Sequence, residues 1–219
     1  MPTPKLSLAN VTPITLRGLT DSDLLEVSAG SHVEARRFTG GDVGGVDLTG
    51  TDFTECEFSG VSADQTQLRG ARISESNIDR LDAAVLLAAR SVIRDVSITA
   101  SRLGSFELYE STFNSVLIRD CKLGFVNLRG AELNNVIFQD CSIDELDLAN
   151  ARINRVTFID TSIDTLDVTG ATLRNADLRG ASLRQINGLA GLRGAIITGE
   201  QSFELATVFA NHLGLQVVG

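Results

Sequence analysis

The chain has 219 residues and a formal net charge of −9, with an isoelectric point near 4.7. This charge repels a phosphate backbone, which argues against direct nucleic-acid binding. The longest apolar run, at 83–89, is too short to cross a bilayer, and residues 1–13 lack the apolar core of a signal peptide. We therefore expect a cytoplasmic protein without membrane contacts.

The first segment, residues 1–34, is predicted to cap one end of the fold. All three prolines, Pro2, Pro4 and Pro13, lie in it, and proline cannot donate to a hydrogen-bond ladder. The stretch 19–25 predicts a short helix that begins after Thr20.

From Phe38 to Leu183, every fifth residue is apolar, thirty times in succession. Neither an α-helix, with a period of about 3.6, nor a β-strand, with a period of about 2, repeats in this way. A second set at the same spacing, from Val46 to Ile186, holds only apolar or small residues. Each five-residue unit is therefore predicted to turn two residues inward and three, mostly polar, outward.

A longer period of twenty residues lies over the shorter one, since SIDELDL at 142–148 returns as SIDTLDV at 162–168. Side-chain type sorts by column at this period. One column is large, with Phe38, Phe58, Ile78, Ile98, Ile118, Phe138, Phe158 and Leu178. Another is small, with Thr51, Ala71, Ser91, Ser111, Ala131, Ala151 and Ala171. Such sorting is expected if four units close one coil and each side chain packs on its copy in the next coil.

The units VDLTG at 46–50, AELNN at 131–135, ATLRN at 171–175 and ADLRG at 176–180 resemble the A(D/N)Lxx repeat of the pentapeptide-repeat family. The resemblance covers about residues 35 to 190. It implies an all-β fold, a right-handed quadrilateral β-helix with one unit on each side. About eight coils are expected in residues 35–194, stacked about 4.8 Å apart.

The last segment, residues 195–219, predicts an α-helix from Glu200 to Leu213, with Thr198 as N-cap and Gly214 as the stop. The apolar face of this helix consists of Phe203, Ala206, Phe209, Ala210 and Leu213. The tail is similar to that of the gyrase-binding mycobacterial and Qnr-type members of the family. That likeness implies a cap that also joins two rods end to end as a homodimer, and a cap that covers only its own core is the alternative.

No sequence feature indicates a catalytic, cofactor or metal site. Cys121 and Cys141 fall one coil apart in an inward column, where we expect buried reduced thiols rather than a disulfide. His32 and His212 have no partners at ligand spacing. The glycine-rich stretch 40–45 lacks the Lys-Ser/Thr of a phosphate loop and is expected to form turns. We therefore predict a protein that is not an enzyme.

Stacked outward acids form the candidate partner-binding face. Its members are Asp120, Asp140, Asp144, Glu145, Asp147, Asp160, Asp164 and Asp167, with only Arg152 and Arg155 expected nearby. Like charges at regular spacing resemble the phosphates of a duplex, so this face fits a basic DNA-binding groove, and a solvated face that keeps the rod soluble is the alternative. For the fold, Asp147→Asn is expected to matter little, whereas Ala151→Arg is expected to abolish folding.

Several outward positions are apolar, namely Val85, Leu87, Val92, Leu117 and Ile137. If residues 80–92 form a regular coil, Val85 and Leu87 are exposed and mark a partner patch. A local bulge that buries them is the alternative.

The favoured function is that of a non-enzymatic rod, a scaffold or protein-binding module of a bacterium. The alternative is a DNA mimic that binds DNA gyrase or a related topoisomerase and protects it from inhibitors, as in quinolone resistance.

Overall fold

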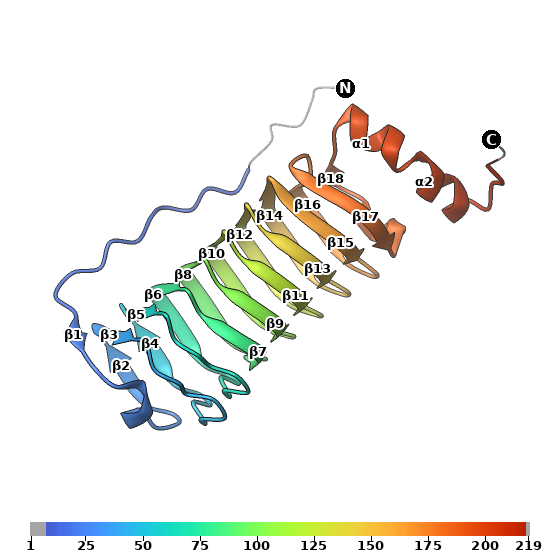
Figure 1. Cartoon of the computed structure of the whole chain (residues 1–219). Coiled ribbons are helices and arrows are strands. Elements are labelled where there is room, and N and C mark those ends of the chain that lie inside the picture. Colours follow the sequence, from blue (N-terminus) through green and yellow to red (C-terminus); the bar gives the residue numbers. More distant parts are fainter. Residues whose placement is uncertain (1–7, 218–219) are drawn as a thin grey trace.

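The computed structural model describes residues 8–217. The chain coils into a parallel β-solenoid of about nine turns, followed at its C-terminal end by two short helices (Figure 1). The predicted quadrilateral β-helix is confirmed. The turn beyond the predicted eight comes partly from the N-terminal edge, where Thr20–Asp21 pairs with Arg36–Arg37.

Each regular coil gives one strand to each of two sheets, and every strand pairing is parallel. The first sheet contains β1 (Thr20–Asp21), β2 (His32–Glu34), β3 (Arg36–Thr39), β4 (Asp52–Thr54), β5 (Glu57–Ser59), β6 (Arg72–Asp79), β8 (Val92–Thr99), β10 (Thr112–Arg119), β12 (Glu132–Gln139), β14 (Arg152–Ile159), β16 (Thr172–Asp177) and β18 (Ala195–Ile196). The second contains β7 (Asp82–Leu87), β9 (Arg102–Glu107), β11 (Lys122–Asn127), β13 (Ser142–Asp147), β15 (Thr161–Asp167) and β17 (Ala181–Asn187).

The register of neighbouring strands explains the twenty-residue period. In the regular coils each residue faces the residue twenty positions later, as in the pairs Phe138↔Phe158 and Leu146↔Leu166. One circuit of the solenoid therefore takes four five-residue units, and the repeated SID segments at 142 and 162 lie side by side in β13 and β15.

The corners between sides fall at residues with left-handed backbone geometry. The eight-residue strands bend in the middle at such residues, for example Ser115 with φ 57° in β10 and Asn135 with φ 62° in β12. Asp120 and Asp140, with φ 56° and 51°, form the next corner. Asn, Asp and Gly tolerate this conformation best, which explains their abundance at every fifth position.

The core is a set of side-chain columns that run along the axis. The thirty apolar residues at every fifth position from Phe38 to Leu183 are all buried except Leu68 and Leu183, which are half-buried. The rings of Phe138 and Phe158 stack with centroids 5.1 Å apart and planes at 12°. In the small column, Ala131 and Ala151 are 0% and 1% exposed. Side chains of similar size therefore stack along the axis and fill the interior of the solenoid.

Polar residues in the inward columns bond to the backbone. Ser91 Oγ donates to the Ala88 carbonyl at 2.7 Å, and Thr66 Oγ1 donates to the Val43 carbonyl at 2.7 Å. Within the described residues, no buried side-chain nitrogen or oxygen lacks a hydrogen-bond partner. The hydroxyl groups therefore avoid the desolvation penalty of an unpaired polar atom.

The N-terminal end differs from the prediction of a helix after Thr20. Residues Thr20–Asp21 form β1, and the helical segment is a single 3-10 turn, η1 (Leu24–Glu26), capped by the Asp23 carboxylate. Leu24 is buried against the end of the core. Residues 8–19 do not cap the end. They lie along the side of the rod, and the start of this segment lies nearer the C-terminal end of the rod (Figure 1). We call this segment the N-terminal arm.

The solenoid ends where small residues allow the chain to leave the regular coil. The 3-10 segment η2 (Leu189–Leu192) contains Gly191, where a Cβ atom would lie 1.9 Å from the Val168 carbonyl oxygen. Such a contact is far below van der Waals distance, so only glycine fits. Two helices follow, α1 (Gly199–Glu204) and α2 (Ala206–His212). None of the helices within residues 8–217 has the length and hydropathy to cross a bilayer.

The predicted C-terminal helix is present but is divided at Leu205. Thr198 is its N-cap as expected, and a capping box joins it to Gln201. Leu205 and Gln201 are buried against the solenoid end, and the Gln201 amide donates to the carbonyls of Leu178 and Ala181, both at 2.7 Å. These two side chains close the open end of the core.

Candidate protein-binding surfaces

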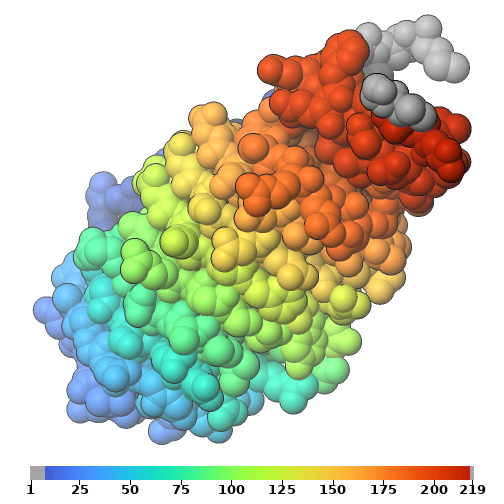
Figure 2. All heavy atoms as spheres, turned by 45° about the vertical axis from the view of Figure 1, so that its right-hand side comes forward, coloured from blue at the N-terminus to red at the C-terminus, as the bar shows by residue number. Residues whose placement is uncertain are grey.

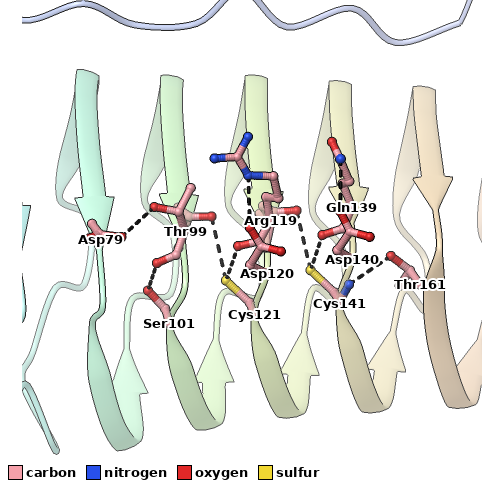
Figure 3. A network of polar contacts seen from close by, with 12 residues as sticks. Asp79, Thr99, Ser101, Arg119, Asp120, Cys121, Gln139, Asp140, Cys141 and Thr161 are labelled. Carbon is pink, nitrogen blue, oxygen red and sulfur yellow. Dashed lines mark hydrogen bonds and ion pairs between the residues drawn. The ribbon is translucent and has the colours of Figure 1, made fainter.

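The corner after the long strands carries a row of aspartates. Asp120, Asp140 and Asp160 follow β10, β12 and β14, one coil apart, and all three are exposed. Figure 3 shows Asp120 and Asp140 at matching places in successive coils. At a spacing of about 4.8 Å, two neighbouring carboxylates repel by about 1 kcal/mol in water. The row therefore attracts cations more strongly than isolated carboxylates do.

Two of these aspartates have polar neighbours that reduce the repulsion. Arg119 Nε lies 3.2 Å from Asp120 Oδ2, and the Gln139 amide donates to Asp140 Oδ2 at 3.0 Å. The expectation that only Arg152 and Arg155 lie near the acids is therefore wrong. Arg119 precedes Asp120 directly in the sequence, but the column pattern alone does not tell toward which neighbour an outward arginine turns.

A second group of acids lies on the adjacent side, in the second sheet. Asp144 and Glu145 in β13 and Asp164 in β15 are exposed. Arg184 Nη1 lies 3.9 Å from Asp164 Oδ2, at the outer limit of an ion pair. These three residues continue the negative surface from the aspartate corner onto the neighbouring side.

Asp147 does not belong to this surface, contrary to the prediction. It is 4% exposed. Its Oδ1 accepts the Ala149 N–H at 2.8 Å, and its Oδ2 accepts two bonds from the Arg129 guanidinium, at 2.7 and 3.1 Å. Asp167, stacked on it, is half-buried and accepts the Thr169 N–H at 2.8 Å. Both carboxylates are engaged in the fold, so the exposed acidic surface is smaller than the sequence suggested.

The Arg129 guanidinium is stabilised in its charged form by this contact. The hydrogen bond and the charge of Asp147 raise the pKa of the Arg129 guanidinium above its ordinary value. Sequence reasoning missed this contact because the two residues lie 18 positions apart, one coil less two residues. A diagonal contact between neighbouring columns leaves no periodic signal.

A hollow beside the aspartate corner gains two further acids from the C-terminal segment. It is lined by the corner residues, by Lys122 and Arg179, and by Glu200 and Glu204 of α1. The acids of the helix were not included in the predicted face because the sequence does not show where the tail folds back. The corner and α1 together place negative charge on two walls of this hollow. We call these five acids, Asp120, Asp140, Asp160, Glu200 and Glu204, the acidic corner.

The predicted apolar face of the tail is divided between two environments. Phe209 and Ala210 are half-buried, whereas Phe203 and Leu213 are 83% and 72% exposed and Ala206 is exposed. Leu215 and Val217 beyond the helices are each 58% exposed. The helix pair protrudes beyond the end of the solenoid (Figure 2). The exposed apolar side chains there are a second candidate surface for a protein partner.

Residues 80–92 form a regular coil, without the bulge considered above. In β7, Val85 and Leu87 pair with Ser105 and Glu107 in the ordinary twenty-residue register. Both side chains are half-buried and line a shallow groove with Tyr109. This groove is a minor apolar patch on an otherwise polar side.

The cysteines are buried and free in the described structure. The thiols of Cys121 and Cys141 each have two carbonyl oxygens within hydrogen-bond distance, with the shortest S···O distance at 3.2 Å in both cases (Figure 3). Burial raises the pKa of the Cys56 thiol above its usual value. Residues 8–217 also contain no group of three or more His, Cys, Asp or Glu side chains suited to a metal ion.

These features define the class of the protein as a repeat-built solenoid with acidic and apolar outer surfaces. A family model described as pentapeptide repeat region matches residues 111–188, and one described as pentapeptide repeats (8 copies) matches residues 37–74. The chain belongs to the pentapeptide-repeat family.

Solved structures that match the chain include QnrB1, described as a plasmid-mediated fluoroquinolone resistance protein. A trypsin-treated variant of it is 17% identical, with 94% of this chain and 100% of that chain covered and a TM-score of 0.38. The full-length form is 17% identical, with 89% and 95% covered and a TM-score of 0.37. No curated protein sequence matches the chain.

Proposed function

We propose that this chain is a non-enzymatic rod that binds another protein through its acidic corner. The observation that carries the proposal is the exposed row of Asp120, Asp140 and Asp160 at one-coil spacing. Neighbouring Asp144, Glu145 and Asp164 extend the negative surface. A partner with a regularly spaced basic surface neutralises these charges together and relieves the repulsion between them.

A DNA-binding groove of a topoisomerase such as gyrase is a specific candidate for this partner. The carboxylates repeat about every 4.8 Å along the rod, compared with one phosphate charge about every 1.7 Å along the axis of a DNA duplex. A single row is therefore less dense in charge than DNA. The second row on the adjacent side brings the two densities closer, which favours a DNA-mimic role for the two rows together.

A supercoiling assay with DNA gyrase, with and without a fluoroquinolone, tests this role. We expect the wild-type chain to inhibit supercoiling or to protect it from the drug, and the triple variant Asp120→Asn, Asp140→Asn, Asp160→Asn to lose at least tenfold in potency. The matched control Glu55→Gln, Glu75→Gln, Asp82→Asn removes the same charge from exposed positions in earlier coils. Equal potency of the two triple variants would mean that net charge, not the corner, is responsible.

No effect at stoichiometric excess would remove gyrase as the partner. The broader proposal has a separate test, which is recovery of a basic protein from the native host by the wild-type chain and by the control triple variant but not by the corner variant. Equal recovery by all three chains would contradict a binding role for the acidic corner.

A further inference from the structure

The N-terminal arm lies on one outward column of the first sheet. Ala9 N–H donates to Thr157 Oγ1 at 3.3 Å, and the Asn77 amide donates to the Ile14 carbonyl at 3.4 Å. Between these ends the column holds Ser97, Leu117 and Ile137. We call this column, Asn77 to Thr157 together with the corner residue Asn135, the lane.

The arm is extended along the full length of the lane. Thr157 and Asn77 lie four coils apart, about 19 Å at the spacing of hydrogen-bonded strands. The five residue steps from Ala9 to Ile14 span about 16–18 Å in an extended chain. The span exceeds the length of the arm only by a distance that the side chains of Thr157 and Asn77 can bridge. The arm is therefore extended along the axis and perpendicular to the strands beneath it, as Figure 1 shows.

The lane binds the main chain of the arm rather than its side chains. Asn135 Oδ1 accepts the Asn10 N–H at 2.8 Å, and Asn135 Nδ2 donates to the Asn10 carbonyl at 2.7 Å. One side-chain amide thus satisfies both backbone groups of a single residue. Within the described residues, every hydrogen bond between arm and lane uses an arm backbone group. Such contacts accept any sequence that can lie extended.

Any selectivity for side chains comes from the half-buried positions of the arm. Val11 and Ile14 are half-buried, whereas Asn10, Thr12 and Thr15 are exposed. Thr157 is 8% exposed although it points outward from its strand, which indicates that the arm covers this end of the lane.

The lane is uncharged from Asn77 to Thr157, and the charged residues of the same column, Glu57 and Arg37, lie beyond its N-terminal end and pair with each other. None of its residues is ionisable, on a chain with a net charge of −9, and its centre is apolar at Leu117 and Ile137. Within residues 8–19 only Arg17 is charged. The lane therefore suits an uncharged segment, since a charged one would lose hydration without gaining a partner.

We propose that the lane is a binding site for an extended, uncharged segment of a partner protein, and that the arm occupies it as an internal competitor. The partner segment places apolar side chains over Leu117 and Ile137 and its backbone on Asn135. The last hydrogen bond of the arm to the lane joins Ile14 and Asn77, and Gly18, with a φ of 69°, lies between this contact and β1. This site is distinct from the acidic corner and does not depend on gyrase binding.

The test uses the full chain and a fluorescent synthetic peptide with the sequence of residues 8–19. Val11→Asp with Ile14→Asp weakens the arm and leaves the lane intact. A tethered competitor acts at an effective concentration of the order of millimolar. We therefore expect the peptide to bind the weakened-arm protein at least tenfold more tightly than the wild type, measured by fluorescence anisotropy. Faster hydrogen exchange in residues 8–19 should accompany this gain, and an arm that stays protected would contradict the assigned contacts.

Two matched controls separate lane binding from other adsorption. Ile137→Asp, added to the weakened-arm protein, should abolish binding of the peptide, whereas Thr112→Asp on another exposed position should leave it unchanged. A peptide that carries the same two aspartates should not bind. Equal binding to the wild type and the weakened-arm protein would overturn the proposal. Association of the weakened-arm protein beyond the state of the wild type in light scattering, reversed by the peptide, would also overturn it in favour of arm exchange between copies.

Discussion

At the scale of the residue, several outward acids of the repeat form hydrogen bonds that stabilise the backbone. Asp47, Asp147, Asp167 and Asp177 each accept the N–H of the residue two positions later. Asx turns of this kind fix the backbone as it approaches a corner. At these four positions the acid of the A(D/N)Lxx unit thus serves the fold first, whereas Asp82 and Glu132, at the same position of other units, are exposed.

Replacement of Asp147 by alanine tests this distinction. We expect Asp147→Ala to lower the free energy of unfolding by about 1–3 kcal/mol, because the Ala149 N–H and the Arg129 guanidinium lose their acceptor. Exposed Asp144, in the same strand, is the matched control, and Asp144→Ala should change stability by less than about 0.5 kcal/mol. Urea unfolding followed by circular dichroism measures both, and equal effects would contradict the structural role of Asp147.

Asp177 should make stability depend on acidity. The hydrogen bonds and charge of Arg179 outweigh burial and hold the pKa of the Asp177 carboxyl below its ordinary value of 3.8. Its stabilising contribution is therefore complete above about pH 5 and is lost as the pH falls through the lowered pKa of the folded state. We expect Asp177→Asn to be less stable than the wild type at pH 7, with the difference shrinking toward pH 3. A difference that stays constant over this range would exclude the ion pair as its source.

At the scale of the element, the sequence predicts the coils well because the same contact recurs many times. Ala151 lies between Ala131 and Ala171 in a column that holds only Ala, Ser and Thr, and the period of twenty reveals this. The bend between α1 and α2, and the burial of Gln201 against the solenoid end, leave no such trace. A contact made once in the fold has no periodic signal.

Substitution of Ala151 tests the stacking of small residues. Ala151→Arg places an unpaired charge between two neighbouring coils, at a cost of several kcal/mol, and we expect no folded protein by circular dichroism. Ala151→Leu should fold with a loss of about 1–3 kcal/mol from overpacking. The exposed neighbour Arg152 pairs with Glu132 at 2.6 Å, and Arg152→Ala should cost less than about 1 kcal/mol. A stable Ala151→Arg protein would contradict the inward assignment of this column.

At the scale of the whole molecule, the rod is regular in its middle and specialised at its two ends and along one side. The periodic pattern predicts the regular part, because each coil packs only on its neighbours. It does not predict the course of the N-terminal arm, which contacts residues 125 and 148 positions away. It also leaves open whether the exposed tail meets a second copy. These non-repeating segments are where the function of an otherwise uniform rod can become specific.

The tail is expected to join two rods, because four large apolar side chains remain exposed there: Phe203, Leu213, Leu215 and Val217. Light scattering of the wild type should give twice the chain mass of 23.4 kDa. Phe203→Asp with Leu213→Asp should give a single chain, because a dimer interface cannot bury the new carboxylates without loss of hydration. Ser202→Asp with Thr207→Asp adds the same charge at exposed polar positions of the same helices and should remain dimeric. A wild type that scatters as one chain at all concentrations would show that the helix pair caps only its own core.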